Sequence, residues 1–149
     1  MRRFALLGIA VLLAGCSSRE GEPAADTMAA APAAMLTAAD VAGTWTARTM
    51  REGSDSVLVT YEIVATGTTE GWTINFANRP PIPMRVSFSG DSVMMSAGPY
   101  ESVLRAGVQV TTETVSRLTN GMLVGRAVAH YSSGTDTVVV LRTEATRKP

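Results

Sequence analysis

Residues 117–131, RLTNGMLVGRAVAHY, contain the strongest fold signal in the chain. Asn120 and Gly121 both tolerate a positive φ, which a tight two-residue hairpin turn requires at its central positions. The residues on either side of this turn are rich in Val, Thr and other types that are typical of strands. This stretch therefore predicts two antiparallel strands joined by a tight turn, the second of them over residues 122–131.

The same pattern recurs outward from this hairpin in both directions. We expect strands over residues 44–50, 56–65, 72–76, 84–88, 92–96, 103–118, 122–131 and 135–145, with a bend in the sixth at Gly107. Segment 78–83 contains three prolines, which cannot donate to a strand ladder, and segment 97–101 is expected to be a loop. No long helical pattern interrupts the strands, so sequential antiparallel pairing is the expected topology.

The number of strands indicates whether the sheet closes on itself. Eight strands can close into a barrel whose interior just holds its own side chains or one small ligand. Closure also removes the exposed edges that an open sheet has to protect. We therefore predict an all-β fold, a small antiparallel eight-stranded up-and-down barrel, with a β-sandwich as the alternative.

Gly43-Thr44-Trp45 stands at the beginning of the first expected strand. It resembles the glycine-any-tryptophan motif of lipocalins and their shorter bacterial relatives. The resemblance implies that Trp45 plugs the closed end of the barrel and that a basic residue late in the last strand packs over it. Arg142 and Arg147 are both candidates for that residue. The long C-terminal helix of the larger lipocalins is not evident, so the resemblance is to the compact bacterial type.

The N-terminus has the pattern of an export signal. Two arginines precede an apolar stretch over residues 4–14, which is too short for a membrane span of ~20 residues but suits a signal peptide. The stretch ends in Leu13-Ala14-Gly15-Cys16, which resembles the bacterial lipobox. The resemblance implies cleavage before Cys16, a diacylglycerol thioether on its sulfur and an acyl chain, palmitate for example, on the new amino group. A plain secretory signal with an incidental cysteine is the alternative.

The composition changes after Cys16. Alanine and proline dominate up to residue 39, and large apolar residues are scarce, so this stretch cannot offset its ordering entropy by burial. We therefore expect a signal peptide over residues 1–15, a lipidated flexible tether over 16–39 and a barrel domain over 40–149. A short helical turn is expected over residues 36–41, with Thr37 as its N-cap and Asp40 as the capping-box partner. By resemblance to enterobacterial sorting, Ser17 in place of Asp favours the outer membrane, with the domain facing the periplasm.

Charge and cysteine content exclude several classes of protein. Thirteen basic and 13 acidic residues leave no net charge, and no basic face points to a nucleic-acid partner. The single cysteine allows no internal disulfide. The glycines occur singly at turns and form no phosphate-binding loop. The expected partner is therefore a membrane, through the lipid.

Residues for catalysis are scarce. His130 is the only histidine, and no Gly-x-Ser-x-Gly nucleophile motif is present. Metal-ligand spacing is absent as well, because the one cysteine belongs to the lipobox and the carboxylates are not clustered. We therefore expect no enzymatic activity, no metal and no cofactor apart from the covalent lipid.

Five residues are candidates for a ligand site inside the barrel: Tyr61, Trp72, Met84, Phe88 and Arg126. Arg126 shares a strand face with Met122, Val124, Val128 and His130. If that face lines the interior, Arg126 needs a partner such as Glu62, Glu113 or a ligand carboxylate. The alternative is that Arg126 lies outside the barrel or at its open end.

Two functions fit these features. The first is a non-catalytic, lipocalin-like domain that binds a small apolar ligand in the cell envelope. The second is a structural or interaction module that docks on an envelope protein. The first predicts a cavity of a few hundred Å³ inside the barrel and the second an interior filled with side chains, and alternation in sequence does not show packing density.

Overall fold

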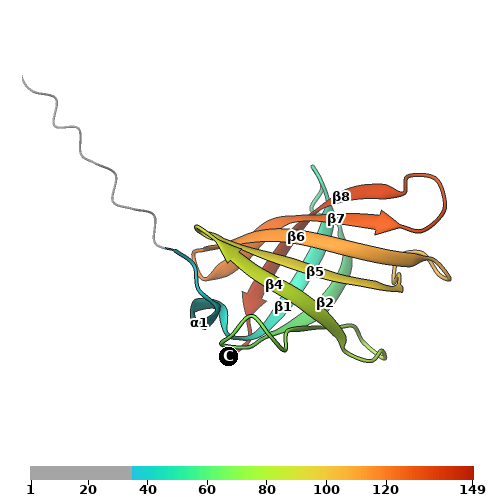
Figure 1. The fold of residues 1–149 in the computed structure, drawn as a ribbon. Coiled ribbons are helices and arrows are strands. Elements are labelled where there is room, and N and C mark those ends of the chain that lie inside the picture. The colour runs from blue at the N-terminus through green and yellow to red at the C-terminus, as the bar shows by residue number, and fades with distance from the viewer. Residues whose placement is uncertain (1–34) are drawn as a thin grey trace, which may run out of the picture. The chain divides into compact units, whose positions relative to one another are not determined.

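The computed structural model describes residues 35–149; the lipobox with Cys16 and most of the expected tether lie outside the described residues. One short helix and eight strands make up the described chain (Figure 1). They are α1 (Ala38–Val41), β1 (Gly43–Arg51), β2 (Val57–Ala65), β3 (Thr73–Asn75), β4 (Ile82–Ser89), β5 (Ser92–Glu101), β6 (Gln109–Thr119), β7 (Met122–Tyr131) and β8 (Val138–Arg147).

The eight strands form a closed barrel in which each strand pairs antiparallel with the next. The ring closes between β1 and β8, whose register runs from Trp45 opposite Arg147 to Arg51 opposite Leu141. The predicted all-β, eight-stranded, up-and-down barrel is confirmed, and the sandwich alternative is excluded. β7 has the bounds that the opening stretch predicts.

The two ends of the barrel differ. At one end β1 begins and β8 ends, and α1 lies next to them (Figure 1). The Asn120-Gly121 turn and the Gly90-Asp91 turn are at this same end, and the Leu36 N–H donates to the Gly90 carbonyl at 2.8 Å. We call this the closed end. The opposite end, the open end, carries the loops over residues 52–56, 76–81, 102–108 and 132–137.

The helical turn at the closed end forms as expected, over a slightly shorter range. The carboxylate of Asp40 accepts hydrogen bonds from the backbone N–H and the hydroxyl of Thr37, at 2.8 and 2.6 Å. These two bonds stabilise the ionised carboxylate and lower the pKa of Asp40. The turn positions the Val41 carbonyl to accept a hydrogen bond from the Trp45 indole at 2.9 Å.

The interior is filled unevenly. β2, β3, β4 and β5 and the residue after β3 contribute large inward side chains, which are Tyr61, Ile63, Ile74, Phe76, Met84 and Met95. The inward residues of β7, β8 and β1 are mostly small, including Ala47, Ala127, Ala129, Thr143 and Ala145. The large side chains of one wall therefore occupy the space that the small residues of the other wall leave.

The predicted boundary between the fifth and sixth strands is wrong. β5 continues to Glu101, and residues 103–108, predicted as strand, form a loop before β6. The register of β5 with β6 shifts between Ala97 and Tyr100, so the chain passes Gly98-Pro99 as a bulge and pairing resumes. Gly98 has φ +118°, and a Cβ on it would lie 2.7 Å from the Val110 carbonyl oxygen. Glycine is needed there because the two backbones approach so closely.

Candidate functional site

An apolar cavity lies inside the barrel toward the open end. The volume of this cavity is about 60 Å³. Its walls come from every strand except β4, and Ser102, Val103 and Leu104 of the 102–108 loop roof it. The remaining lining residues are Thr49, Val59, Tyr61, Ile74, Phe76, Tyr100, Val110, Thr112, Thr114, Ala127, Ala129, Tyr131 and Leu141.

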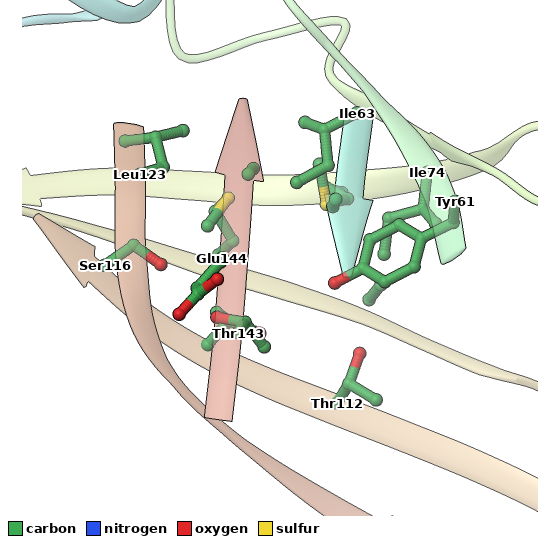
Figure 2. A pocket seen from close by; sticks show the side chains of 14 residues that line it. Tyr61, Ile63, Ile74, Thr112, Ser116, Leu123, Thr143 and Glu144 are labelled. Carbon is green, nitrogen blue, oxygen red and sulfur yellow. The ribbon is translucent and has the colours of Figure 1, made fainter. Parts of the chain in front are cut away.

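A second, smaller cavity of about 20 Å³ lies deeper in the barrel (Figure 2). Tyr61, Ile74, Thr112 and Thr114 line both cavities. The two volumes are far below the ~300–1,000 Å³ of pockets that hold drug-sized ligands. The larger cavity is still well above the ~10–15 Å³ that one water molecule needs. The larger cavity is less than half of the ~150 Å³ of an apolar cavity that binds benzene, so a single-ring ligand fits only if the 102–108 loop or the shared wall of the two cavities shifts.

All three tyrosines of the chain, Tyr61, Tyr100 and Tyr131, line the open-end cavity. Phe76 lies between two of them, with ring centroids 5.4 Å from Tyr61 and 5.9 Å from Tyr100. Tilted rings at these separations attract one another in addition to burying apolar area. The cavity wall on this side is a continuous aromatic surface.

The tyrosine hydroxyls are in an environment that disfavours charge. Burial raises the pKa of Tyr61, and a hydrogen bond with Thr49 opposes this rise only in part. Burial likewise raises the pKa of Tyr100, against a smaller effect of its hydrogen bond with Thr112. Both phenols are therefore neutral at physiological pH and can donate a hydrogen bond.

The raised pKa values predict a loss of stability in alkali. Unfolding exposes Tyr61, whose phenol then ionises near its ordinary pKa of 10.0. The contribution of neutral Tyr61 to stability is therefore complete below pH 10 and is lost as the pH rises through the higher folded pKa. Alkaline unfolding followed by circular dichroism and tyrosinate absorbance should show a midpoint that Tyr61→Phe moves to higher pH. Equal midpoints for the parent and the variant would contradict this assignment.

The loop that roofs the cavity is a compact turn. The Ser102 hydroxyl oxygen accepts from the backbone N–H groups of Leu104 and Arg105 at 3.0 and 3.1 Å. The Arg105 guanidinium lies over the Tyr131 ring, 3.8 Å from its centroid, and donates to the carbonyls of Thr135 and Asp136. Arg105 thus holds the 102–108 loop against the 132–137 loop across the open end.

Of the five predicted ligand residues, two line the interior cavities, and Trp72, Phe88 and Arg126 do not. Tyr61 lines both cavities and Met84 lines the deeper one. Trp72 is fully buried at the closed end, with the Phe88 ring packed edge-on against it at 6.2 Å. Trp72 and Phe88 therefore seal the closed end and line neither cavity.

Arg126 does not point into the barrel. Its side chain is 64% exposed and pairs with Glu52 at 2.7 Å, so the partners expected for an inward Arg126, Glu62 and Glu113, are not the ones that it contacts. The inward residues of β7 are Leu123, Gly125, Ala127, Ala129 and Tyr131. Val124 and Val128 lie outside with Arg126, because successive residues of a strand point to opposite faces. The alternative in which Arg126 lies outside is the one that the structure shows.

Trp45 is buried at the closed end of the barrel. Its side chain is fully buried, and the Arg147 guanidinium lies over the indole, 4.4 Å from the ring centroid. Arg147 also donates to the carbonyls of Asp40 and Ala42, which connects β8 to α1. Of the two candidate basic residues, Arg147 is the one that packs over Trp45.

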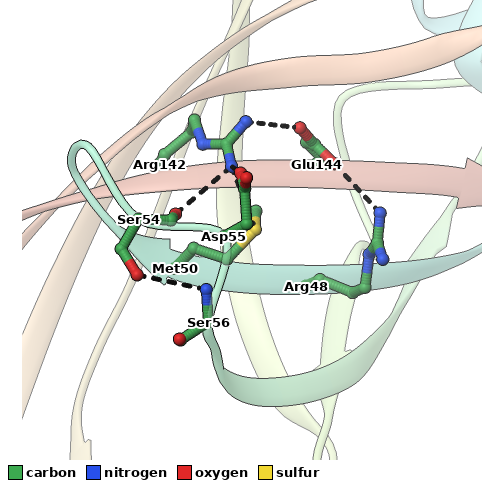
Figure 3. Close-up of polar contacts among 7 residues, drawn as sticks. All are labelled: Arg48, Met50, Ser54, Asp55, Ser56, Arg142 and Glu144. Carbon is green, nitrogen blue, oxygen red and sulfur yellow. Dashed lines mark hydrogen bonds and ion pairs between the residues drawn. The ribbon is translucent and has the colours of Figure 1, made fainter.

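Arg142 has a different environment, in the middle of β8 and opposite Met50 of β1 (Figure 3). It pairs with Asp55 at 2.6 Å and with Glu144 at 2.8 Å, and Arg48 contacts the other oxygen of Glu144 at 3.0 Å. The network connects β8, β1 and the 52–56 loop. Asp55 is fully exposed, and an ion pair with an exposed partner contributes little to stability, so the Arg142–Asp55 pair positions the 52–56 loop more than it stabilises the barrel.

Several lining residues escape prediction from sequence. Tyr100 follows Gly98-Pro99, which indicates a loop, and Tyr131 stands at a strand end next to a turn. Ala127 and Ala129 line the cavity through their small size, which gives no signal in an alternation pattern. The presence of Tyr100 in a strand could have been inferred only if Gly98 had been interpreted as a bulge.

No metal-binding cluster is found within residues 35–149. No set of three His, Cys, Asp or Glu side chains in this range is arranged to hold a metal ion. His130 is exposed on the outer face at the end of β7, opposite Thr111 and Val138. No helix in the same range is long and apolar enough to cross a membrane.

Comparison of the chain with models of protein families, with curated proteins and with solved structures found no match. Function therefore has to be inferred from the residues and the geometry of this chain itself.

Proposed function

We propose that this protein is a non-catalytic lipoprotein of the bacterial cell envelope whose barrel binds a small, mostly apolar ligand. The lipid on Cys16 attaches it to a membrane, and Ser17 favours the outer membrane with the barrel facing the periplasm. Two features support the proposal independently. One is the sequence Leu13-Ala14-Gly15-Cys16, and the other is the apolar cavity beneath the 102–108 loop.

The anchor is tested by removing the thiol. Because stable attachment takes more than one acyl chain, a protein that cannot be lipidated should leave the membrane or stay uncleaved in its precursor form. We expect Cys16→Ala to abolish incorporation of a labelled palmitate analogue, whereas the neighbouring variant Ser18→Ala labels like the parent. Label on the Cys16→Ala protein, measured after fractionation of the envelope, would refute the anchor.

The open-end cavity is the observation that supports the proposed binding of a small apolar ligand. Its walls are aromatic and aliphatic, and hydroxyls are its only side-chain polar groups. Burial of apolar ligand surface contributes roughly 25 cal/mol per Å², which favours an apolar occupant. The loop that covers the cavity connects two strands and is held by Arg105 at its tip, so a ligand can enter if this loop moves.

Benzene is the simplest probe for this site. The three tyrosines line the open-end cavity, whereas both tryptophans, Trp45 and Trp72, are at the closed end. In the full-length protein with ¹³C-labelled tyrosine and tryptophan rings, benzene should shift the tyrosine signals and leave the tryptophan signals in place. Saturable shifts confined to tyrosine are the expected result. No tyrosine shift at millimolar benzene would exclude the proposed ligand site and favour a module that docks on an envelope protein.

A further inference from the structure

Hydroxyls supply every polar side-chain group in the open-end cavity. Among its lining residues in the described chain there is no Asp, Glu, Lys, Arg or His. The deeper cavity adds one ionisable carboxylate, Glu144, which is paired with both Arg48 and Arg142. A charged ligand group inside the barrel would therefore find no free counter-charge from these lining residues, and burial of an unpaired charge is strongly unfavourable.

One of these hydroxyls is poorly satisfied. The Tyr61 hydroxyl accepts a hydrogen bond from the Thr49 hydroxyl at 3.4 Å, whereas O–H···O bonds are usually about 2.7–2.8 Å. A phenol that accepts one long bond still has its own proton to donate. Figure 2 shows Tyr61 reaching into the interior, with Thr112 on the facing strand. The Tyr61 hydroxyl is thus a donor that faces the cavities.

The aromatic wall gives this donor a fixed position. Phe76 packs against the ring of Tyr61 at 5.4 Å, and Tyr61 extends inward from β2 between the two cavities. Burial also raises the pKa of Tyr61, so this group stays protonated at physiological pH. A neutral hydroxyl with a fixed position in an apolar cavity favours ligands that carry a hydrogen-bond acceptor over ligands that carry none.

We infer that the barrel interior selects an uncharged ligand, with an apolar body of about one ring and a single hydroxyl or carbonyl that accepts a hydrogen bond from Tyr61. This inference rests on the proposed ligand-binding function and assigns its chemistry. Carboxylates of the same shape are excluded, because the lining residues offer them no cation and the walls desolvate them.

Three probes with the same ring test the selection: benzene, phenol and benzoate. They are titrated at neutral pH against the full-length protein, with the tyrosine ring signals as readout and free ligand set by dialysis. One hydrogen bond from Tyr61 should make phenol bind about fivefold tighter than benzene. Benzoate should produce no saturable shift in the range where phenol saturates.

Variants connect the preference to Tyr61. Tyr61→Phe should remove the phenol-to-benzene affinity ratio, as read from Tyr100 and Tyr131. Thr60→Val is the matched control, because Thr60 is the neighbouring residue in β2 and is exposed on the outer face. It should keep the ratio at about fivefold.

The outcomes separate this inference from the proposed function. If benzene binds but phenol binds no tighter, or if benzoate binds as tightly as phenol, the barrel is a ligand site and the assigned chemistry is wrong. A preference for phenol that persists in Tyr61→Phe also overturns the role of this hydroxyl. If none of the three probes shifts a tyrosine signal, the proposed function fails and this inference fails with it.

Discussion

Replacement of Trp45 with alanine is expected to lower the free energy of unfolding by about 4 kcal/mol, within the range for buried Trp→Ala changes. The indole is completely buried between α1 and the strands of the closed end. Its removal leaves a cavity, and it also leaves the Val41 carbonyl without the donor that lies 2.9 Å away. Urea denaturation followed by circular dichroism measures the change.

The contributions of Arg147 and Trp45 to the stability of the closed end can be measured separately. Arg147 lies over the indole, but from an exposed position, where such a contact contributes about 0.5–1 kcal/mol. Arg147→Met should therefore destabilise the barrel much less than Trp45→Ala, and Trp45→Phe should be intermediate between them. A Trp45→Ala protein that loses less than about 1 kcal/mol would show that the closed end is sealed without the indole.

Gly125→Ala is expected to destabilise the barrel by about 3 kcal/mol, at the upper end of the range for overpacking. Gly125 lies in β7, opposite Ser116 of β6 and Thr143 of β8. A Cβ at this position would lie 2.1 Å from the Val115 carbonyl oxygen and 2.7 Å from the Ser116 Cα. Since both are backbone atoms, no side-chain rotation relieves the clash, and β6 and β7 must separate.

Gly67 provides the matched control for this substitution. It lies in the loop between β2 and β3, its φ is not in the left-handed region, and a Cβ on it would meet no atom within 4 Å. Gly67→Ala should change the free energy of unfolding by no more than about 0.5 kcal/mol. Equal denaturation midpoints for the two variants would mean that the strands at Gly125 can move apart freely.

The expectations for Trp45 and Gly125 differ in how far the sequence predicts them. Trp45 stands in the Gly43-Thr44-Trp45 motif at the start of a strand, so the sequence already points to it as a buried residue at one end of the barrel. Nothing in the sequence marks Gly125, because a glycine within a strand indicates a bulge as readily as a close approach of two backbones. The clash with Val115 depends on how closely the backbones of β6 and β7 approach each other at this point in the barrel.

The residues of the candidate site likewise differ in how far the sequence predicts their positions. Tyr61 and Met84 could be selected because they alternate with polar residues in clear strands. Trp72 and Phe88 alternate equally well, but they point inward at the closed end and not beside a cavity. Alternation predicts that a side chain faces the interior, and it does not predict the height along the barrel axis at which space is left.

By itself, the sequence determined most local features: eight segments of strand type, the turns other than the one between β5 and β6, the hairpin at Asn120-Gly121 and the motif around Trp45. These follow from backbone sterics and period-two alternation, which act over a few residues. Tertiary structure alone decided which face of β7 is inside, that Arg147 and not Arg142 covers Trp45, and how much space is left beneath the 102–108 loop. Each of these depends on how side chains from strands far apart in the sequence pack together inside a closed barrel. No single segment of the sequence contains that information.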